Sequence, residues 1–178
     1  MSATDLDLAR RAKDGDRVAF RHLLERHYDM LYRVAYRFFG NIAEAEDVAQ
    51  EMAMTIADRV GSFRGDSQFS TWLYRVAING CRDHARRRRS ASELQKSYMA
   101  FAEHRAADWA DSDGKVRWLY RALDRLEPAL KETALLVLAE DMSHAQAGEV
   151  LGVAESTVSW RMYEVKKRLK TIARIGDE

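Results

Sequence analysis

Hydrophobic residues recur at three- and four-residue spacing along most of the chain, which is the pattern of amphipathic α-helices. The turn Asp14-Gly15-Asp16 follows a short first helix. A long helix is then predicted up to the pair Gly40-Asn41, with its apolar positions at Phe20, Leu23, Leu24, Leu31, Val34, Ala35 and Phe38. The same spacing predicts the next helix over residues 42–60, with apolar positions at Ala45, Val48, Ala49, Met52, Ile56 and Val60.

A fourth helix is predicted to begin near Phe69, after a glycine-containing loop, and to lead into the arginine run Arg86 to Arg89. The pair Asn79-Gly80 lies inside this helix. Helical spacing on both sides favours a weak point or kink there over a hairpin turn. Periodicity fades beyond Ser90, where Ala, Ser and Asp accumulate. We therefore predict a flexible linker over residues 93–114.

A second block of helices is predicted after this linker. Its first apolar stripe consists of Val116, Leu119, Leu123 and Leu126. Pro128 suits the first turn of a following helix that extends to about Asp141. Ser143 is a favourable N-cap for a short helix that ends at Leu151-Gly152. The last helix is predicted from Glu155 or Ser156 to about residue 175.

The composition agrees with a helical fold. A single Pro and nine Gly in 178 residues disfavour a sandwich of many short strands, and 47% hydrophobic residues are enough for a core. We predict an all-α protein of two helical domains, residues 1–92 and 115–178. The single cysteine, Cys81, cannot form an internal disulfide. Because no run reaches the about 18 apolar residues of a membrane helix, we expect a soluble, cytoplasmic protein without membrane contact.

The last two predicted helices have the features of a helix-turn-helix motif. Gly148 would let the two helix backbones approach closely, and Val158 is among the apolar residues that would fix the second helix across the first. The second helix carries polar and then basic residues: Ser156, Thr157, Ser159, Trp160, Arg161, Tyr163, Lys166 and Lys167. Polar groups at base edges and cations at phosphates are what recognition of the major groove requires. An ordinary helical hairpin with a solvated basic face is the alternative.

Aromatic and basic residues are combined in the fourth predicted helix and the loop before it. The aromatic residues Phe63, Phe69, Trp72 and Tyr74 precede Arg75, Asn79, Arg82 and the run Arg86 to Arg89. Residues 79–98 contain six basic and two acidic side chains, a local charge of +4. Aromatic rings that stack on bases, beside cations that hold phosphates, suit single-stranded nucleic acid. Core aromatics and a solvated helix end are the alternative.

The third predicted helix has the opposite charge. Residues 41–58 contain no Lys or Arg, but carry Glu44, Glu46, Asp47, Glu51 and Asp58. An acidic helix cannot face phosphates favourably, so this surface is expected to meet a protein partner or water.

The sequence offers little for catalysis. None of the five histidines belongs to a Glu-x-x-His or His-Glu-x-x-His motif, and no second cysteine accompanies Cys81 and His84. A glycine-rich phosphate loop and a Gly-x-Ser-x-Gly motif are also missing from the sequence. We therefore predict a protein that is not an enzyme and that uses no cofactor or metal.

Taken together, these stretches resemble the extracytoplasmic-function (ECF, group IV) sigma factors of bacterial RNA polymerase over nearly the whole chain. Residues 45–51, 63–67 and 69–77 are similar to sigma region 2. Leu126-Glu127-Pro128 and the predicted helix-turn-helix are similar to sigma region 4. The resemblance implies a factor that directs core polymerase to specific promoters and helps to melt the −10 element, under the control of an anti-sigma factor.

The resemblance also implies residue roles. The helix around Asp47, Gln50 and Glu51 would bind the coiled coil of the largest polymerase subunit, and the second-largest subunit is a further implied contact. The −10 element would be bound by Phe63, Arg64, Trp72, Arg75, Asn79, Asp83, Arg86 and Arg87. Among these, Asn79 and Asp83 lie where the family reads a flipped-out base. The last helix, including Tyr163, would read the −35 element as duplex.

Two positions depart from the family pattern. Ala147-Gly148 stands where members often have a large apolar residue followed by Ala, and Ser159-Trp160 where a basic residue followed by Ser is common. A stand-alone helix-turn-helix regulator that binds DNA without polymerase is an alternative function. A protein-interaction adaptor that uses the acidic helix is another.

Overall fold

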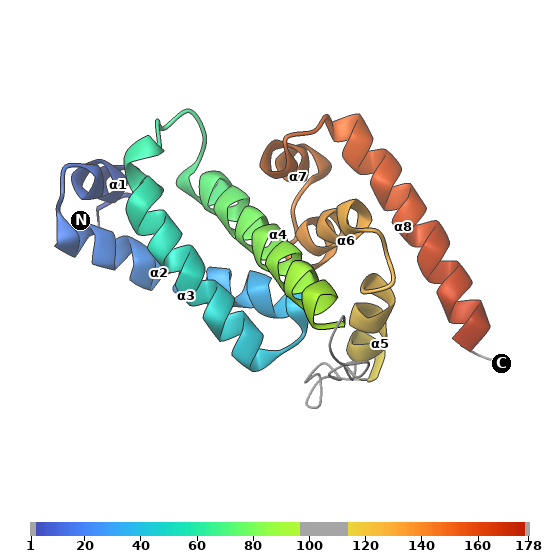
Figure 1. The fold of residues 1–178 in the computed structure, drawn as a ribbon. Helices are drawn as coiled ribbons and strands as arrows, with labels where there is room; N and C mark the ends of the chain where they lie inside the picture. The colour runs from blue at the N-terminus through green and yellow to red at the C-terminus, as the bar shows by residue number, and fades with distance from the viewer. Residues whose placement is uncertain (1–2, 97–113, 177–178) are drawn as a thin grey trace. The chain divides into compact units, whose positions relative to one another are not determined.

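The computed structural model describes residues 3–96 and 114–176, and all the regular secondary structure within these ranges is helical. The chain divides into two compact units, residues 1–108 and 109–178. The prediction of an all-α protein with two helical domains is therefore confirmed (Figure 1). Of the predicted linker 93–114, residues 97–113 lie outside the described part of the chain. The predicted boundaries 1–92 and 115–178 stay predictions.

The described part of the first unit, residues 3–96, contains four α-helices and one short 3₁₀-helix. They are α1 (Asp5–Lys13), α2 (Arg17–Phe39), α3 (Ile42–Arg59), η1 (Val60–Ser62) and α4 (Phe69–Lys96). The Asp16 carboxylate accepts hydrogen bonds from the first backbone N–H groups of α2, and Gly40 ends that helix at φ 68°. Gly is favoured there because a side chain is strained in this conformation. The turn and helix ends predicted for this region agree with the structure.

The core of the first unit lies between α2, α3 and α4. Its most buried large side chains include Leu23, Leu31, Val48, Met52, Leu73 and Ile78. α4 continues as a helix through Asn79-Gly80. A Cβ added at Gly80 would lie 3.0 Å from the Met52 Cγ, so this glycine marks a close approach of α4 to α3.

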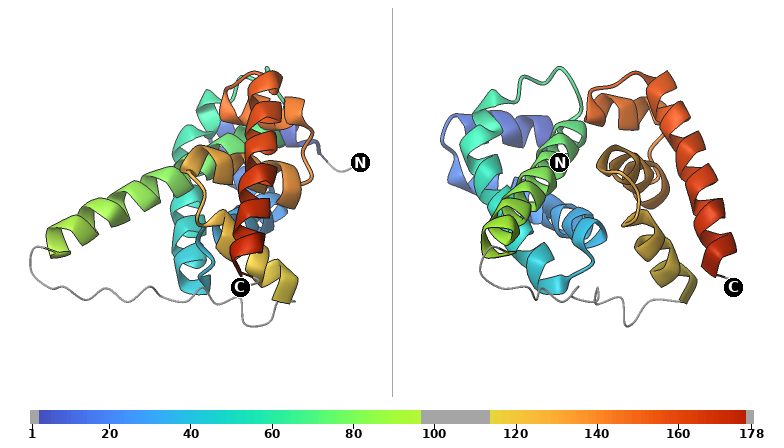
Figure 2. Two further views of the ribbon diagram at one scale, coloured as in Figure 1. Left: turned by 90° about the vertical axis from the view of Figure 1, so that its right-hand side faces the viewer. Right: turned by 45° about the vertical axis from the view of Figure 1, so that its right-hand side comes forward.

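In the second unit, the last helix packs against two of the earlier helices. Its elements are α5 (Gly114–Leu123), α6 (Pro128–Ala134), the π-helical turn η2 (Leu135–Ala139), α7 (His144–Leu151) and α8 (Glu155–Gly176) (Figure 2). α8 packs against α6 and α7, where Val158 and Val165 are fully buried. Pro128 occupies the first turn of α6, as predicted. None of the described helices in either unit is long and apolar enough to cross a membrane.

The turn between α7 and α8 has the predicted helix-turn-helix geometry. Ser143 and Gln146 form a capping box at the start of α7, and Gly152 ends it at φ 69°. A Cβ added at Gly148 would lie 2.8 Å from the Val153 carbonyl oxygen. The predicted close approach at Gly148 is confirmed, because no side chain fits between these backbones without a shift.

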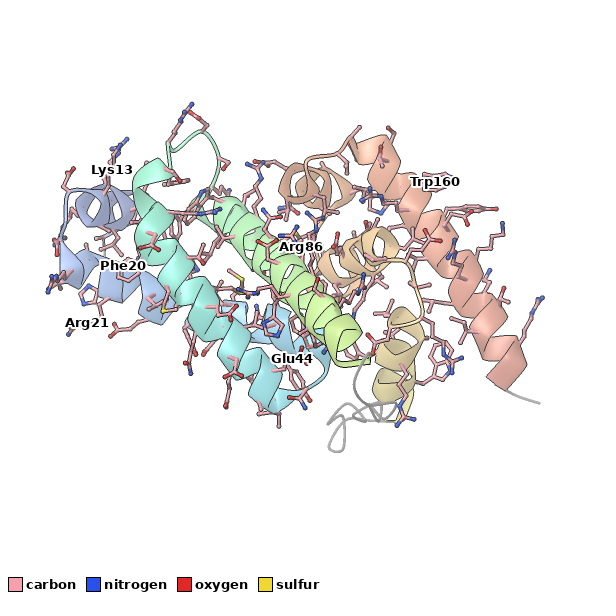
Figure 3. The ribbon with its side chains drawn as sticks, in the orientation of Figure 1. Lys13, Phe20, Arg21, Glu44, Arg86 and Trp160 are labelled. Atoms are coloured by element: carbon pink, nitrogen blue, oxygen red, sulfur yellow. The ribbon has the colours of Figure 1, made fainter. Side chains whose placement is uncertain are left out.

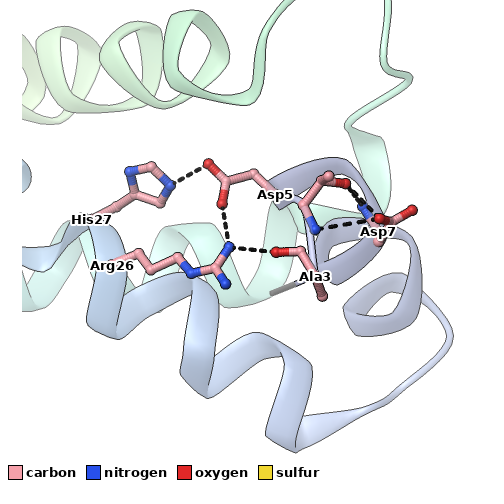
Figure 4. A network of polar contacts seen from close by, with 6 residues as sticks. Ala3, Asp5, Asp7, Arg26 and His27 are labelled. Atoms are coloured by element: carbon pink, nitrogen blue, oxygen red, sulfur yellow. Dashed lines mark hydrogen bonds and ion pairs between the residues drawn. The ribbon is translucent and has the colours of Figure 1, made fainter. Parts of the chain in front are cut away.

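Surface side chains of the first unit include Lys13 and Arg21, which point to solvent (Figure 3). The N-terminal helix is held by a polar network (Figure 4). One Asp5 carboxylate oxygen accepts a 2.9 Å hydrogen bond from Arg26 Nη1, and the other lies 2.8 Å from His27 Nε2. Burial by itself would raise the pKa of the Asp5 carboxyl, but the contacts with Arg26 and His27 outweigh it and lower that pKa.

Candidate nucleic-acid interface

The exposed face of α3 is acidic, with one large apolar side chain. Asp47 and Gln50 are exposed, together with Glu46 and Asp58. Met54 lies among them and is 65% exposed, which is unusual for a large apolar residue. The hydrophobic periodicity did not single out Met54, although its position outside the apolar stripe was a visible signal. This face combines negative charge with an apolar contact point.

Two other acidic residues of α3 face α4 instead. Glu44 accepts a 2.6 Å hydrogen bond from Arg88 Nη1, and Glu51 forms an ion pair with Arg87. The imidazole of His84 lies between the two carboxylates, 3.4 Å from Glu44 Oε1 and 3.7 Å from Glu51 Oε2. Glu51 is thus only partly available for the polymerase contact that was predicted for it.

The arginine run at the end of α4 is divided between two directions. Arg87 and Arg88 reach α3, and the Arg88 guanidinium lies 5.8 Å from the centre of the Phe39 ring. The Arg86 side chain is 78% exposed and donates a 2.9 Å hydrogen bond to Asp83. Figure 3 labels Arg86 on α4 and Glu44 on α3. The division follows from the helix geometry, since consecutive residues are rotated by about 100°.

An aromatic cluster supports the loop before α4. The ring of Phe63 lies 5.2 Å from Phe69 and 5.8 Å from Trp72, measured between ring centres. Phe63 and Phe69 are buried, whereas Trp72 is partly exposed and Arg64 is exposed. The buried ring of Phe63 therefore shapes the loop in this structure and does not present a free face for stacking.

The remaining residues predicted for the −10 element share one face of α4. Trp72, Arg75, Asn79, Asp83 and Arg86 recur at three- and four-residue spacing, and the last three are exposed. Arg82 Nη1 donates a 3.1 Å hydrogen bond to Asn79 Oδ1. This face offers hydrogen-bonding groups and cations next to a partly exposed indole.

The first turns of α8 present aromatic, hydroxyl and ammonium groups. Trp160 and Tyr163 are 60% and 64% exposed, and Trp160 projects away from the helix in Figure 3. The other exposed residues of the predicted set are Ser156, Ser159, Lys166 and Lys167. Thr157 and Arg161 are only partly exposed, and Arg161 Nη1 lies 3.4 Å from Thr133 Oγ1 of α6. Arg161 therefore faces the body of the unit.

One residue at the start of α7 was missed by the sequence reasoning. The Nδ1 atom of His144 lies 2.8 Å from the Ser159 hydroxyl oxygen of α8. The sequence places His144 directly after the N-cap Ser143, but it contains no signal that joins His144 to a residue 15 positions away.

The chemistry of these surfaces is that of binding. Among the described residues, no group of three or more His, Cys, Asp or Glu side chains could hold a metal ion. The helix-turn-helix and the cationic face of α4 fit nucleic acid, while the acidic face of α3 fits a protein. These features are typical of a helical DNA-binding protein.

Comparisons with known proteins identify the family to which this chain belongs. Residues 23–91 match Sigma-70 region 2, and residues 116–169 match Sigma-70, region 4. The ECF RNA polymerase sigma factor SigM of Mycobacterium tuberculosis is 31% identical over 93% of this chain and 83% of SigM. The chain therefore belongs to the ECF sigma factors of RNA polymerase, as its sequence motifs predicted. The stand-alone regulator is not favoured.

Solved structures show the same fold. CnrH, in complex with the cytosolic domain of CnrY, has a TM-score of 0.67 and 24% identity, covering 94% of this chain and 96% of that chain. The sigma factor RpoE of Bartonella quintana, in complex with the anti-sigma factor NepR, has a TM-score of 0.65 and 22% identity. The match covers 88% of this chain and 97% of that chain.

Proposed function

We propose that this ECF sigma factor binds core RNA polymerase through the exposed face of α3, and promoter DNA through α4 and α8. The observation that supports this assignment is the separation of charge between exposed faces. Residues 41–58, which cover α3 up to the residue before its final Arg59, contain no Lys or Arg, whereas the exposed faces of α4 and α8 carry cations. Phosphates repel the first kind of face and attract the second. The factor itself performs no covalent chemistry, because nucleotide addition belongs to the polymerase.

The polymerase contact is centred on Asp47, Gln50 and Met54. An exposed apolar side chain surrounded by polar groups is the usual arrangement of an interaction hot spot. The carboxylate of Asp47 would pair with a basic side chain of the largest subunit. Glu51 lies at the edge of this contact, where its pairing with Arg87 links the polymerase surface to α4.

The −10 element engages the outward face of α4 as a single strand. Asn79 and Asp83 offer the hydrogen-bonding groups that an extruded base needs, and Trp72 offers a surface for stacking. Arg75 and Arg86 hold phosphates. Phe63 packs against Phe69 and Trp72 and thereby holds the loop before α4 in place. Arg64 and the start of α4 can then reach the DNA strand.

The −35 element is bound as duplex DNA, with the start of α8 in its major groove. Ser156, Ser159 and Trp160 face the bases; an aromatic ring there can contact a thymine methyl group. Lys166 and Lys167 hold phosphates further along the helix, together with Tyr163. Thr157 and Arg161 support the helix from its partly buried side.

An anti-sigma factor is the proposed regulator, acting in the cytoplasm together with polymerase and DNA. The related fold of RpoE has been determined with the anti-sigma factor NepR, and the sequence resemblance implies the same kind of partner. Such a protein would block both polymerase and DNA by covering exposed apolar side chains such as Met54 and Trp160.

The polymerase contact is tested with the variant Asp47→Arg. Asp29→Arg, at an exposed position of α2, is the matched control. Purified core polymerase should bind the Asp47 variant about tenfold or more weakly, because like charges would then oppose each other. The control should bind as the wild type does. Unchanged affinity of the Asp47 variant would refute the assignment of this face.

The promoter function is tested by transcription from a genomic fragment library with core polymerase, with and without the protein. New start sites that share −35 and −10 elements are expected. A folded protein that adds no initiation would instead support the stand-alone regulator.

A further inference from the structure

We propose that His144 sets the direction of the Ser159 hydroxyl group and thereby helps to choose the −35 sequence. This inference rests on the proposed contact between α8 and the major groove. His144 is the first residue of α7, and its Nδ1 lies 2.8 Å from Ser159 Oγ. Ser159 is exposed, and it lies three residues after Ser156 and four before Tyr163 on the face assigned to DNA.

The chemistry of the hydroxyl makes its direction matter. A serine hydroxyl has one proton to donate and two lone pairs to accept with. When Nδ1 carries no proton, the hydroxyl donates to it and presents only lone pairs to the groove, where the amino groups of adenine and cytosine are donors. When Nδ1 carries the proton, the hydroxyl accepts from it and keeps its own proton free to donate to guanine O6 or N7, or to thymine O4.

The imidazole therefore decides whether Ser159 can donate a hydrogen bond to the bases or can only accept one. A serine without such a partner rotates to suit either kind of base edge. His144 is a positioning residue in this arrangement, since it acts on DNA through Ser159.

The hydrogen bond is not needed to form either helix. The start of α7 is secured by the capping box between Ser143 and Gln146. α8 is anchored by Val158, Met162 and Val165, which are at most 3% exposed. The His144–Ser159 bond itself lies at the exposed surface, where water competes for both groups. Its main effect is thus on orientation, and its loss should leave the fold intact.

The experiment uses reconstituted holoenzyme and a duplex library with a randomised −35 segment upstream of a fixed −10 segment. Wild type, His144→Ala, Ser159→Ala and the double variant are compared by sequencing the bound fraction. We expect the two single variants to lose discrimination at the same base pair by about fivefold, the value of one hydrogen bond. The double variant should lose no more than either single one.

Two further variants make the interpretation specific. His144→Asn should restore the preference, because its amide group occupies the place of Nδ1 and can bond the hydroxyl again. Lys166→Ala, the matched control on the same helix, should weaken all sequences alike, as loss of a phosphate contact does. Thermal unfolding of His144→Ala should match that of the wild type.

The outcomes separate the two proposals. A wild-type holoenzyme that selects no −35 sequence would overturn the proposed function and this inference together. A wild type that selects a sequence, with His144→Ala keeping every base preference or weakening all sequences equally, would overturn the role of His144 alone.

Discussion

Gly80 and Gly148 both lie inside helices, yet they tolerate a side chain to different degrees. A Cβ at Gly148 would meet the Val153 carbonyl oxygen at 2.8 Å, and this atom belongs to the backbone of the turn. At Gly80 the nearest atom is the Met52 Cγ at 3.0 Å, which belongs to a flexible side chain. The first contact can be relieved only by a shift of the backbone.

We therefore expect Gly148→Ala to lower the free energy of unfolding of the second unit by about 1–3 kcal/mol. Gly80→Ala should cost much less, since Met52 can move and alanine favours a helix by about 1 kcal/mol over glycine. Urea unfolding of the two variants, followed by the signals of each unit, measures both effects. Equal losses would show that the close approach at Gly148 is not a constraint.

A second prediction at this scale concerns pH. Because the folded state lowers the pKa of Asp5, the stabilisation it provides is present above the ordinary carboxyl pKa and is lost as pH falls through the folded value. At pH 7, Asp5→Asn should reduce the free energy of unfolding by about 0.5–1 kcal/mol, a surface value. In urea titrations at several pH values, the difference in free energy between wild type and variant should shrink as pH falls below the ordinary carboxyl pKa. Asp29→Asn is the control, and a difference independent of pH would contradict the mechanism.

At the scale of elements, the end of α4 combines a side that packs against α3 with a side proposed to bind DNA. Arg88 pairs with Glu44 and covers the Phe39 ring, whereas Arg86 points outward. Arg88→Ala should lower the free energy of unfolding of the first unit by about 1 kcal/mol, with little effect on DNA.

Arg86→Ala should do the reverse, with binding of holoenzyme to a −10 single strand weakened about fivefold and stability unchanged. Urea unfolding and oligonucleotide binding of both variants check the pair. A loss of DNA affinity as large for Arg88→Ala as for Arg86→Ala would refute the division of the run.

The order and ends of the helices could be predicted because they depend on local signals, such as Asp16 as a cap and Gly40 at a positive φ. The residues that contact each helix face could not be predicted from the sequence. The apolar spacing identified the buried side of α3, but Glu51 lies at its margin, where the position of α4 decides its partner. The burial of Phe63 and the contact of Arg161 with α6 likewise depend on packing between elements distant in sequence.

At the scale of the whole molecule, each unit has its own buried core and its own proposed promoter contact. The proposed −10 contact lies on α4 of the first unit, and the proposed −35 contact lies on α8 of the second. The proposed polymerase contact is a third surface, on α3. A change in one surface should therefore impair one step of initiation and leave the others intact.

This separation can be measured with Trp160→Ala, which removes a 60% exposed ring from the −35 contact without disturbing a core. On a duplex promoter, the variant holoenzyme should initiate about tenfold less, as expected for truncation of an aromatic hot spot. On a template with a pre-melted −10 bubble and no −35 element, it should initiate as the wild type does. Trp118→Ala, at the 40% exposed tryptophan of α5, is the matched control and should leave both templates unaffected. Equal loss on both templates would mean that Trp160 acts on the fold or on polymerase binding, because the bubble template requires no −35 contact.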